Sequence, residues 1–309
     1  MSRFPPRRRR TDAIASARPV RMLSVVLPVY NEEDTIEEVV KRVLDVSLPQ
    51  DVALQLIIVE SNSKDRTRAI VQTYESDPLV TLVLQPEPRG KGNAVRAGLH
   101  HVRGDVVLIQ DGDLEYSVDD YAVLLEAIIA GEADFVLGCR HEPGQPMREF
   151  EGAKATSAVL NAAHWTFAGL FNFTYGTNLR DPFTMYKVFR TECIDGLDFV
   201  ADRFDFDFEI VAKLVRRGYQ PIEIPISYNS RGFDKGKKVR PIRDPLTWIV
   251  ALARFRLCRV APRVTPAVEP VPAETGRRTV FDSLLAPSHT TAESPAPTTA
   301  APAPGPRAG

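Results

Sequence analysis

Short apolar segments alternate with segments whose apolar residues recur at helical spacing, and this alternation most constrains the fold. Strand-like runs lie at 23–28, 54–60, 80–85, 105–110 and 134–138, and helix-like segments lie at 31–46, 65–76, 93–102 and 119–130. Continuously apolar strands joined by helices are typical of a parallel sheet that is covered on both faces. We therefore expect an α/β fold with a single, mostly parallel sheet flanked by helices.

The two ends of the chain differ in composition from this body. Residues 1–22 contain seven Arg and one Asp, and the C-terminal residues are dominated by Pro, Ala and Thr. Neither composition buries enough apolar surface to offset the entropy lost on ordering. The sequence therefore predicts a disordered basic segment at 1–22, a folded domain at 23–260 and a disordered tail at 261–309.

Charge and cysteine content exclude some functional classes. With 39 basic and 40 acidic residues the chain is no bulk polycation, and the four arginines at 7–10 are more typical of membrane or nonspecific contact than of specific nucleic-acid binding. Three scattered cysteines without metal-knuckle spacing indicate a reducing compartment. No secretory signal or run of about 18 apolar residues occurs. We expect a cytoplasmic protein, with peripheral contact at the membrane face.

The sharpest chemical signal follows the run at 105–110. Asp111 and Asp113 flank Gly112 there, and Glu115 comes next. Ligands of parallel sheets bind beyond the carboxyl ends of the strands. Carboxylates at that place suit Mg²⁺ or Mn²⁺, which can bridge them to a diphosphate. An acidic turn is the alternative, but we predict a metal site formed by Asp111, Asp113 and Glu115.

Other polar clusters also lie at predicted strand ends. Asn31 and Glu32 follow the first strand, where helix capping is an alternative explanation. The segment 89–94, RGKGNA, combines glycines and cations with a helix start and indicates an anion site. It fails the dinucleotide motif because Val95 stands at the last glycine position. It fails the P-loop motif because Gly92 replaces Ser or Thr.

Six segments, in this order, resemble a known family: VVLPVYNEE, ESNSKDRT, RGKGNA, IQDGDLE, GCR and RRGYQPIEIPISY. Together they are similar to family 2 glycosyltransferases with the GT-A fold, a single Rossmann-like sheet. The most similar subgroup is the polyprenyl-phosphate, dolichol-phosphate mannose synthase-like enzymes. The resemblance covers about 23–245. It implies metal-dependent, inverting transfer of a sugar from a nucleotide-sugar of the GDP-mannose or UDP-glucose type to a lipid phosphate.

The resemblance also implies a set of donor-binding residues. These are Pro28, Tyr30, Asn31, Glu32, Glu60, Ser63, Asp65, Lys91, Gly92, Asp111 and Arg140. The second motif usually begins with two acids, and here Ser61 takes the place of the second one. The contact to the nucleotide base, and with it the choice of GDP or UDP, is left open by this departure.

Three later segments match the acceptor side of the family. The segment 181–187 is similar to the motif D-x-x-[ST]-G-[FY]-[KR], with Met185 replacing Gly, and 206–209 is similar to an aromatic–acid segment before a helix. The segment 230–238 resembles the basic loop that holds the acceptor phosphate. The implied catalytic residues are Asp113, Asp181, Asp207, Glu209 and Arg231; helix capping is the alternative for Asp207 and Glu209. The implied acceptor-phosphate residues are Arg231, Lys237 and Lys238.

The acceptor class can be argued from charge. Residues 231–259 contain nine basic and two acidic residues. A phosphate oxygen is already anionic at neutral pH, since the second phosphate pKa is about 6, whereas a hydroxyl acceptor needs a base. No carboxylate occupies an unambiguous base position, so we favour a phosphate acceptor. The segment 244–260 combines Trp with arginines and suits a membrane interface or packing on the body. A soluble acceptor and an inactive nucleotide-sugar-binding protein stay open as alternatives, and oligomeric state is not indicated.

Overall fold

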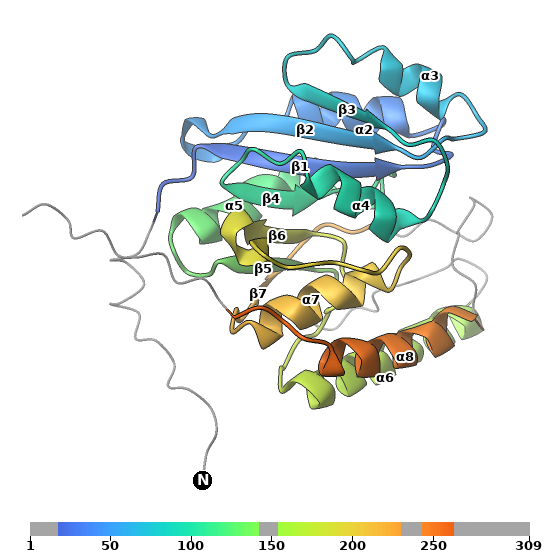
Figure 1. The fold of residues 1–309 in the computed structure, drawn as a ribbon, viewed down its shortest axis with the longest axis vertical. Coiled ribbons are helices and arrows are strands. Elements are labelled where there is room, and N and C mark those ends of the chain that lie inside the picture. The colour runs from blue at the N-terminus through green and yellow to red at the C-terminus, as the bar shows by residue number, and fades with distance from the viewer. Residues whose placement is uncertain (1–17, 142–153, 230–242, 263–309) are drawn as a thin grey trace, which may run out of the picture. The chain divides into compact units, whose positions relative to one another are not determined.

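The computed structural model describes residues 18–141, 154–229 and 243–262 (Figure 1). Seven strands form one sheet in the order β3-β2-β1-β4-β6-β5-β7. The strands are β1 (Met22–Val29), β2 (Ala53–Glu60), β3 (Val80–Leu84), β4 (Val106–Ile109), β5 (Phe135–Cys139), β6 (Lys187–Arg190) and β7 (Ile222–Pro225). All neighbouring pairs are parallel except those of β6, which runs antiparallel to β4 and β5. The predicted mostly parallel sheet is confirmed.

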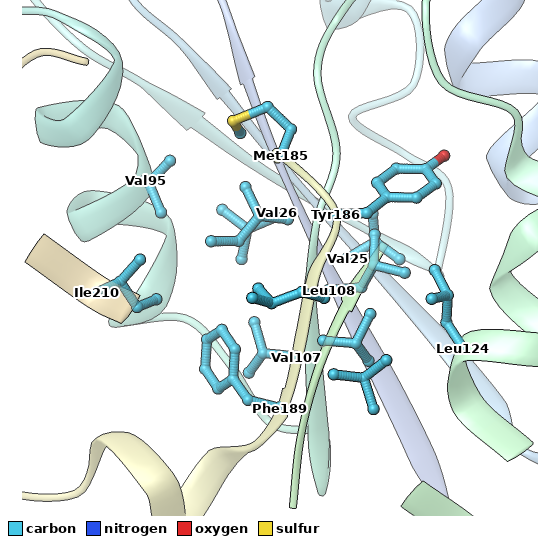
Figure 2. Packing of buried hydrophobic residues seen from close by; sticks show 14 of the residues in the cluster. Val25, Val26, Val95, Val107, Leu108, Leu124, Met185, Tyr186, Phe189 and Ile210 are labelled. Atoms are coloured by element: carbon cyan, nitrogen blue, oxygen red, sulfur yellow. The ribbon is translucent and has the colours of Figure 1, made fainter. Parts of the chain in front are cut away.

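Helices pack on both faces of this sheet. They are α2 (Ile36–Leu44), α3 (Thr67–Gln72), α4 (Lys91–Leu99), α5 (Tyr121–Ile129), α6 (Lys154–Tyr175), α7 (Phe206–Arg216) and α8 (Arg243–Leu257). Figure 2 shows Val25 and Leu108 of the central strands between Val95 and Ile210 on one side and Leu124 on the other. All five side chains are buried. Coverage from both sides explains why these strands are continuously apolar in the sequence.

The first helix and strand β6 differ from the sequence-based expectation, and α6 and β7 were not predicted either. The first helix begins at Ile36 rather than 31, because Asn31 adopts a left-handed φ of 51° and starts a loop. Strand β6 was not predicted, since it begins with Lys187 and ends with Arg190, and four residues of this kind make no apolar run. Both cations are nevertheless buried. Periodicity therefore could not reveal a strand that lies in the middle of the sheet.

Candidate active site

The site lies where strands β1, β2 and β4 end. Val29 pairs with Glu60 at the ends of β1 and β2, and Val26 pairs with Ile109 at the end of β4. The register brings the loops after these strands to one edge of the sheet, as the sequence predicts.

Side chains of the loops after β1 and β2 bond to each other's backbone. The Asn31 amide donates to Ser63 Oγ at 2.9 Å, and Asn31 Oδ1 accepts from the Lys64 amide at 2.8 Å. The Glu32 amide donates to Thr67 Oγ1 at 2.8 Å. Asn31 is therefore not the helix cap: Thr35 precedes α2 and makes no side-chain cap bond. The interpretation of Asn31 as an N-cap is wrong, and the residue instead joins two loops.

Two predicted donor-binding carboxylates shape the second loop. Glu60 is fully buried, accepts from the Ser63 amide at 2.6 Å and forms an ion pair with Arg68. Asp65 accepts from the Thr67 amide at 3.0 Å. Burial raises the pKa of Asp65, but hydrogen bonds from Thr67 and the backbone outweigh it, so the pKa lies below its usual value. Both carboxylates hold the loop after β2 in shape.

Ser61, which takes the place of a family acid, starts a chain of amide hydrogen bonds. Its hydroxyl donates to Gln85 Oε1 at 2.8 Å, and Gln85 Nε2 donates to Asn93 Oδ1 at 2.9 Å. Ser61 is buried. The chain of bonds therefore links the end of β2 to the start of α4, and a neutral group stands where the family motif has a charge.

Lys91 and Asp111 form the closest charged contact at the end of β4 among the described residues. Lys91 Nζ lies 2.7 Å from Asp111 Oδ1, with the two side chains 18% and 21% exposed. Burial lowers the pKa of Lys91, but the attraction of Asp111 and then Asp207 raises it above its usual value. The lysine is thus charged at neutral pH. The structure brings together a predicted donor-binding cation and a predicted metal ligand.

Close packing explains both glycines of the segment 89–94. Gly90 has a φ of 115°, and a Cβ on Gly92 would lie 2.6 Å from the Ala201 carbonyl oxygen and from Phe206 Cβ. The Asn93 amide at the helix start donates to the Asp202 carbonyl at 3.0 Å. These contacts hold the first turn of α4 against the loop before α7. Lys91 is thereby held facing Asp111.

The three predicted metal ligands do not form a metal cluster. Glu115 Oε2 accepts from the Tyr228 hydroxyl at 2.8 Å, and Asp113 Oδ1 accepts from the Glu115 amide at 3.1 Å. Across the described ranges, no three His, Cys, Asp or Glu side chains are arranged to hold an ion. Asp111 and Asp113 nevertheless supply the carboxylate oxygens that Mg²⁺ and Mn²⁺ prefer. They fit such an ion when a bound diphosphate supplies further oxygens.

The predicted catalytic residue Asp181 lies in a buried ion pair. Arg140 Nε and a terminal guanidinium nitrogen donate to the two carboxylate oxygens at 2.7 and 2.8 Å, and the Arg140 amide adds a bond at 3.2 Å. Burial raises the pKa of Asp181, but the guanidinium outweighs it and holds the pKa far below its usual range. Arg140 in turn lies 5.2 Å from the centre of the Tyr228 ring. Asp181 therefore orients an arginine at the site.

The two remaining candidate bases are also paired with cations. Asp207 lies 3.0 Å from Lys187 Nζ, and Glu209 lies 2.5 Å from Lys213 Nζ. Glu209 also accepts from the amide of Ala201 at 2.8 Å, so it holds the preceding loop. Burial lowers the pKa of Lys187 although Asp207 opposes the shift. All three candidate carboxylates are thus engaged by a basic side chain.

Some site residues could not be singled out from the sequence. Gln110 Oε1 accepts from the hydroxyls of Tyr121 and Tyr186 at 2.8 and 2.7 Å, and Gln110 Nε2 donates to the Asp111 carbonyl at 2.9 Å. These bonds fix the chain just before Asp111. The only sequence signal is the polar Gln directly after an apolar strand.

A buried histidine pair was also missed. His141 Nε2 and His164 Nε2 lie 2.9 Å apart, and His164 Nε2 is 3.9 Å from Asp181 Oδ1. Burial lowers the pKa of His164 to about 4. The ring is therefore neutral at pH 7 and links α6 to the Arg140–Asp181 pair.

The predicted acceptor-phosphate residues Arg231, Lys237 and Lys238 lie outside the described residues.

The chain matches the family model described as "Glycosyl transferase family 2" over residues 24–195. It is 26% identical over 221 residues to glycosyltransferase AglJ of Haloferax volcanii, covering 71% of this chain and 67% of the relative. It is 27% identical over 220 residues to an undecaprenyl-phosphate 4-deoxy-4-formamido-L-arabinose transferase of Edwardsiella ictaluri, covering 71% and 63%. It is 27% identical over 225 residues to polyprenol monophosphomannose synthase of Mycolicibacterium smegmatis, covering 70% and 81%. The matched part is thus only 63% of the length of the Edwardsiella relative.

Solved structures share the fold. Mannosyl-3-phosphoglycerate synthase from Rubrobacter xylanophilus has a TM-score of 0.55 at 17% identity, covering 80% of this chain and 79% of that chain. Glucosyl-3-phosphoglycerate synthase from Mycobacterium tuberculosis, in complex with Mn²⁺, UDP and phosphoglyceric acid, has a TM-score of 0.52 at 20% identity, covering 81% and 82%. At these identities the likeness shows the GT-A fold.

Proposed function

The chain belongs to glycosyl transferase family 2, and we propose that it moves a sugar from a nucleotide-sugar to the phosphate of a polyprenyl-type lipid, with inversion. Membership of the family establishes that the chain is a glycosyltransferase. The identities of the donor and the acceptor are our proposal. Named relatives act on undecaprenyl phosphate and make polyprenol monophosphomannose, which supports the acceptor class.

Our choice of a phosphate acceptor rests on one observation: each of the three candidate bases is paired with a cation. Asp181, Asp207 and Glu209 contact Arg140, Lys187 and Lys213, respectively. A carboxylate whose oxygens are held by a cation is poorly placed to accept a proton from a substrate, so a hydroxyl would react slowly here. A phosphate oxygen needs no such base because it is already ionised at neutral pH. The paired site therefore favours a phosphate acceptor over a soluble sugar hydroxyl.

Asp111 and Asp113 are the proposed holders of Mg²⁺ or Mn²⁺. A bound ion would supply neutralisation of the charge that develops on the departing diphosphate. The M. tuberculosis structure holds Mn²⁺ together with UDP, which supports an ion of this class. Glu115 is a less suitable metal ligand, because its carboxylate already accepts a hydrogen bond from the Tyr228 hydroxyl.

Two cations are proposed to bind the diphosphate. Lys91 is charged and held at the end of β4, and Arg140 is fixed by a bidentate bond to Asp181. Preorganised cations stabilise developing negative charge without reorganising during the reaction. The residues proposed to line the nucleotide side of the same edge are Pro28, Tyr30, Asn31, Glu32 and Ser63.

The acceptor phosphate is proposed to bind Arg231, Lys237 and Lys238, a proposal that rests on the sequence alone. Such an enzyme would work at the cytoplasmic face of the membrane.

A transfer assay tests this proposal. The full chain is incubated with radiolabelled GDP-mannose or UDP-glucose, Mg²⁺ or Mn²⁺, and a short polyprenyl phosphate. We expect label in the organic phase with one donor, and loss of that label with EDTA or in Asp113→Asn but not in the exposed control Asp195→Asn. Metal-dependent release of nucleotide without organic-phase label would move the acceptor to the soluble class. If no donor gives either organic-phase label or release of nucleotide, the result would favour an inactive nucleotide-sugar-binding protein.

A further inference from the structure

Two histidines from distant parts of the chain meet beside the Arg140–Asp181 ion pair. His141 follows Arg140 at the end of β5. His164 lies on α6, which, like every helix in the described ranges, is not long and apolar enough to cross a bilayer. The two histidines are 5% and 6% exposed, and the Trp165 ring lies 4.6 Å from the centre of the His141 ring. The contact between the histidines is therefore shielded from water.

A backbone carbonyl fixes the proton positions of both rings. His164 Nε2 lies 3.0 Å from the Arg180 carbonyl oxygen and 2.9 Å from His141 Nε2. A carbonyl oxygen only accepts hydrogen bonds, so His164 carries its proton on Nε2. His141 Nε2 must then be the acceptor, because two N–H groups would repel at this distance, and its own proton lies on Nδ1. One proton of His164 thus joins the Arg180 carbonyl to the His141 ring.

This shared proton connects the two segments that carry the ion pair. Arg180 directly precedes Asp181 in the chain. His141 directly follows Arg140, whose amide donates to Asp181 at 3.2 Å. The Asp181 segment is also held from β7, since Glu223 accepts from the amides of Arg180 and Asp181 at 2.8 and 2.7 Å. The histidines therefore add a second connection between segments whose relative position sets the direction of the Arg140 guanidinium.

The histidine pair makes this connection without adding charge. His164 Nε2 lies 3.9 Å from Asp181 Oδ1, and Arg140 is the cation paired with that carboxylate. Burial lowers the pKa of His164 to about 4; Asp181 opposes the shift, and Arg140 and His141 add to it. At neutral pH the ring therefore leaves both oxygens of Asp181 to Arg140. A charged imidazole at this place would compete with Arg140 for the carboxylate.

We propose that His141 and His164 are positioning residues that hold the Arg140 guanidinium in place for the diphosphate of the donor. The inference rests on the proposed function in one respect, the role of Arg140 as a diphosphate-binding cation. A cation fixed before the reaction stabilises developing charge without reorganising. Loss of the connection should therefore slow the chemical step more than it weakens donor binding, so kcat should fall while KM for the donor stays nearly constant.

Steady-state transfer with the full chain tests the positioning role. Radiolabelled GDP-mannose or UDP-glucose is supplied with Mn²⁺ and a short polyprenyl phosphate. We expect H164L to lower kcat by about tenfold or more, with KM for the donor within about twofold of the wild type. H164Q retains an N–H that can donate to the Arg180 carbonyl and should stay within about threefold of the wild type. The matched control H100L removes an exposed histidine after α4 and should transfer at the wild-type rate.

A double-mutant cycle separates positioning from general packing. R140K retains a charge but loses the bidentate bond to Asp181, so it should itself lower kcat. Because His164 acts through Arg140, adding H164L to R140K should cost less than about twofold. An H164L loss that is as large in R140K as in the wild type would overturn the proposal, and so would an H164Q loss equal to that of H164L. Should H164L fail to fold, H141L applies the same test, because it removes only the acceptor of the shared proton.

Proton NMR of the Arg140 side chain gives a readout that does not depend on activity. The Nε proton of Arg140, bonded to Asp181 at 2.7 Å, should exchange slowly with water in the wild type and in H164Q. Its resonance, assigned by its loss in R140K, should exchange at least about tenfold faster in H164L. Exchange rates that follow this pattern, with no sugar transfer to any acceptor, would refute the proposed function and leave the positioning standing. Sugar transfer with both kcat and exchange unchanged in H164L would refute the positioning and leave the function standing.

Discussion

Replacing Asp181 by Asn removes one charge from an ion pair that is closed off from solvent. The Asp181 carboxylate is fully buried, and the Arg140 side chain is 8% exposed. Asn would leave a buried guanidinium without its counter-ion. Breaking a buried pair in this way costs about 3–5 kcal/mol of the free energy of unfolding. For a domain of this size the melting temperature should fall by roughly 10 °C.

The pH dependence of this loss is fixed by the direction of the pKa shift. Burial raises the pKa of Asp181, and the stronger effect of Arg140 holds it well below its usual range. The carboxyl of the unfolded chain titrates near about 3.9. The stabilisation is therefore complete above that pH and is lost as the pH falls through the lower, folded value. The difference between wild type and D181N should be constant from near neutral to mildly acidic pH and shrink in stronger acid.

Urea unfolding of wild type and D181N, at pH 7 and across the acid range, measures this difference. The exposed control D195N should stay within about 0.5 kcal/mol of the wild type. A D181N protein within about 1 kcal/mol of the wild type at pH 7 would refute the reasoning. So would a difference that grows in acid.

Three further predictions concern glycines, the carboxylates and pH. G92A should lower the free energy of unfolding by about 1–3 kcal/mol, measured by thermal unfolding, because its Cβ would lie 2.6 Å from the Ala201 carbonyl oxygen. The control G169A in α6 has open space around the new Cβ and should raise the free energy of unfolding by up to about 1 kcal/mol. D113N should lower the turnover of nucleotide-sugar by about a hundredfold or more with unchanged unfolding, and a near-normal rate would exclude a metal role. Transfer to a phosphate acceptor should decline below pH of about 6, as the acceptor takes up a proton, and a flat profile down to pH 5 would contradict the phosphate acceptor.

The parallel part of the fold could be predicted because its signal is local. Strands β1, β2 and β4 are buried on both faces, so each is a mostly apolar run that the sequence displays directly. Strand β6 could not be found in this way. Its terminal cations depend on partners that are distant in the sequence, such as Asp207 for Lys187 and the Ile128 carbonyl for Arg190. Such partners become neighbours only in the folded chain.

The candidate site shows the same limit. The strand-end positions of Asp111 and Asp113 follow from the sequence, because a parallel sheet places the ends of its strands at one edge. The contacts of Asp181 and Glu209 do not, since Arg140 lies on another strand end and Glu209 bonds to the loop before its own helix. Resemblance could mark these carboxylates as catalytic candidates. The pairing of Glu209 with Lys213 is local, four residues apart on α7, whereas only three-dimensional contacts reveal that Asp181 is paired with Arg140.

The distribution of charge in the chain bears on the class of acceptor. Three cations of the described site are paired with carboxylates: Lys91 with Asp111, Lys187 with Asp207 and Arg140 with Asp181. A nucleoside-diphosphate sugar is a dianion and its metal a dication, so the two together add no net charge to such a site. An acceptor phosphate arrives without a metal and needs cations of its own. Within 231–259 the sequence carries a surplus of cations, because nine basic residues accompany two acidic ones. If these cations hold the acceptor phosphate as we propose, replacing Arg231, Lys237 and Lys238 by Gln should impair transfer to a lipid phosphate while leaving metal-dependent binding of the donor intact.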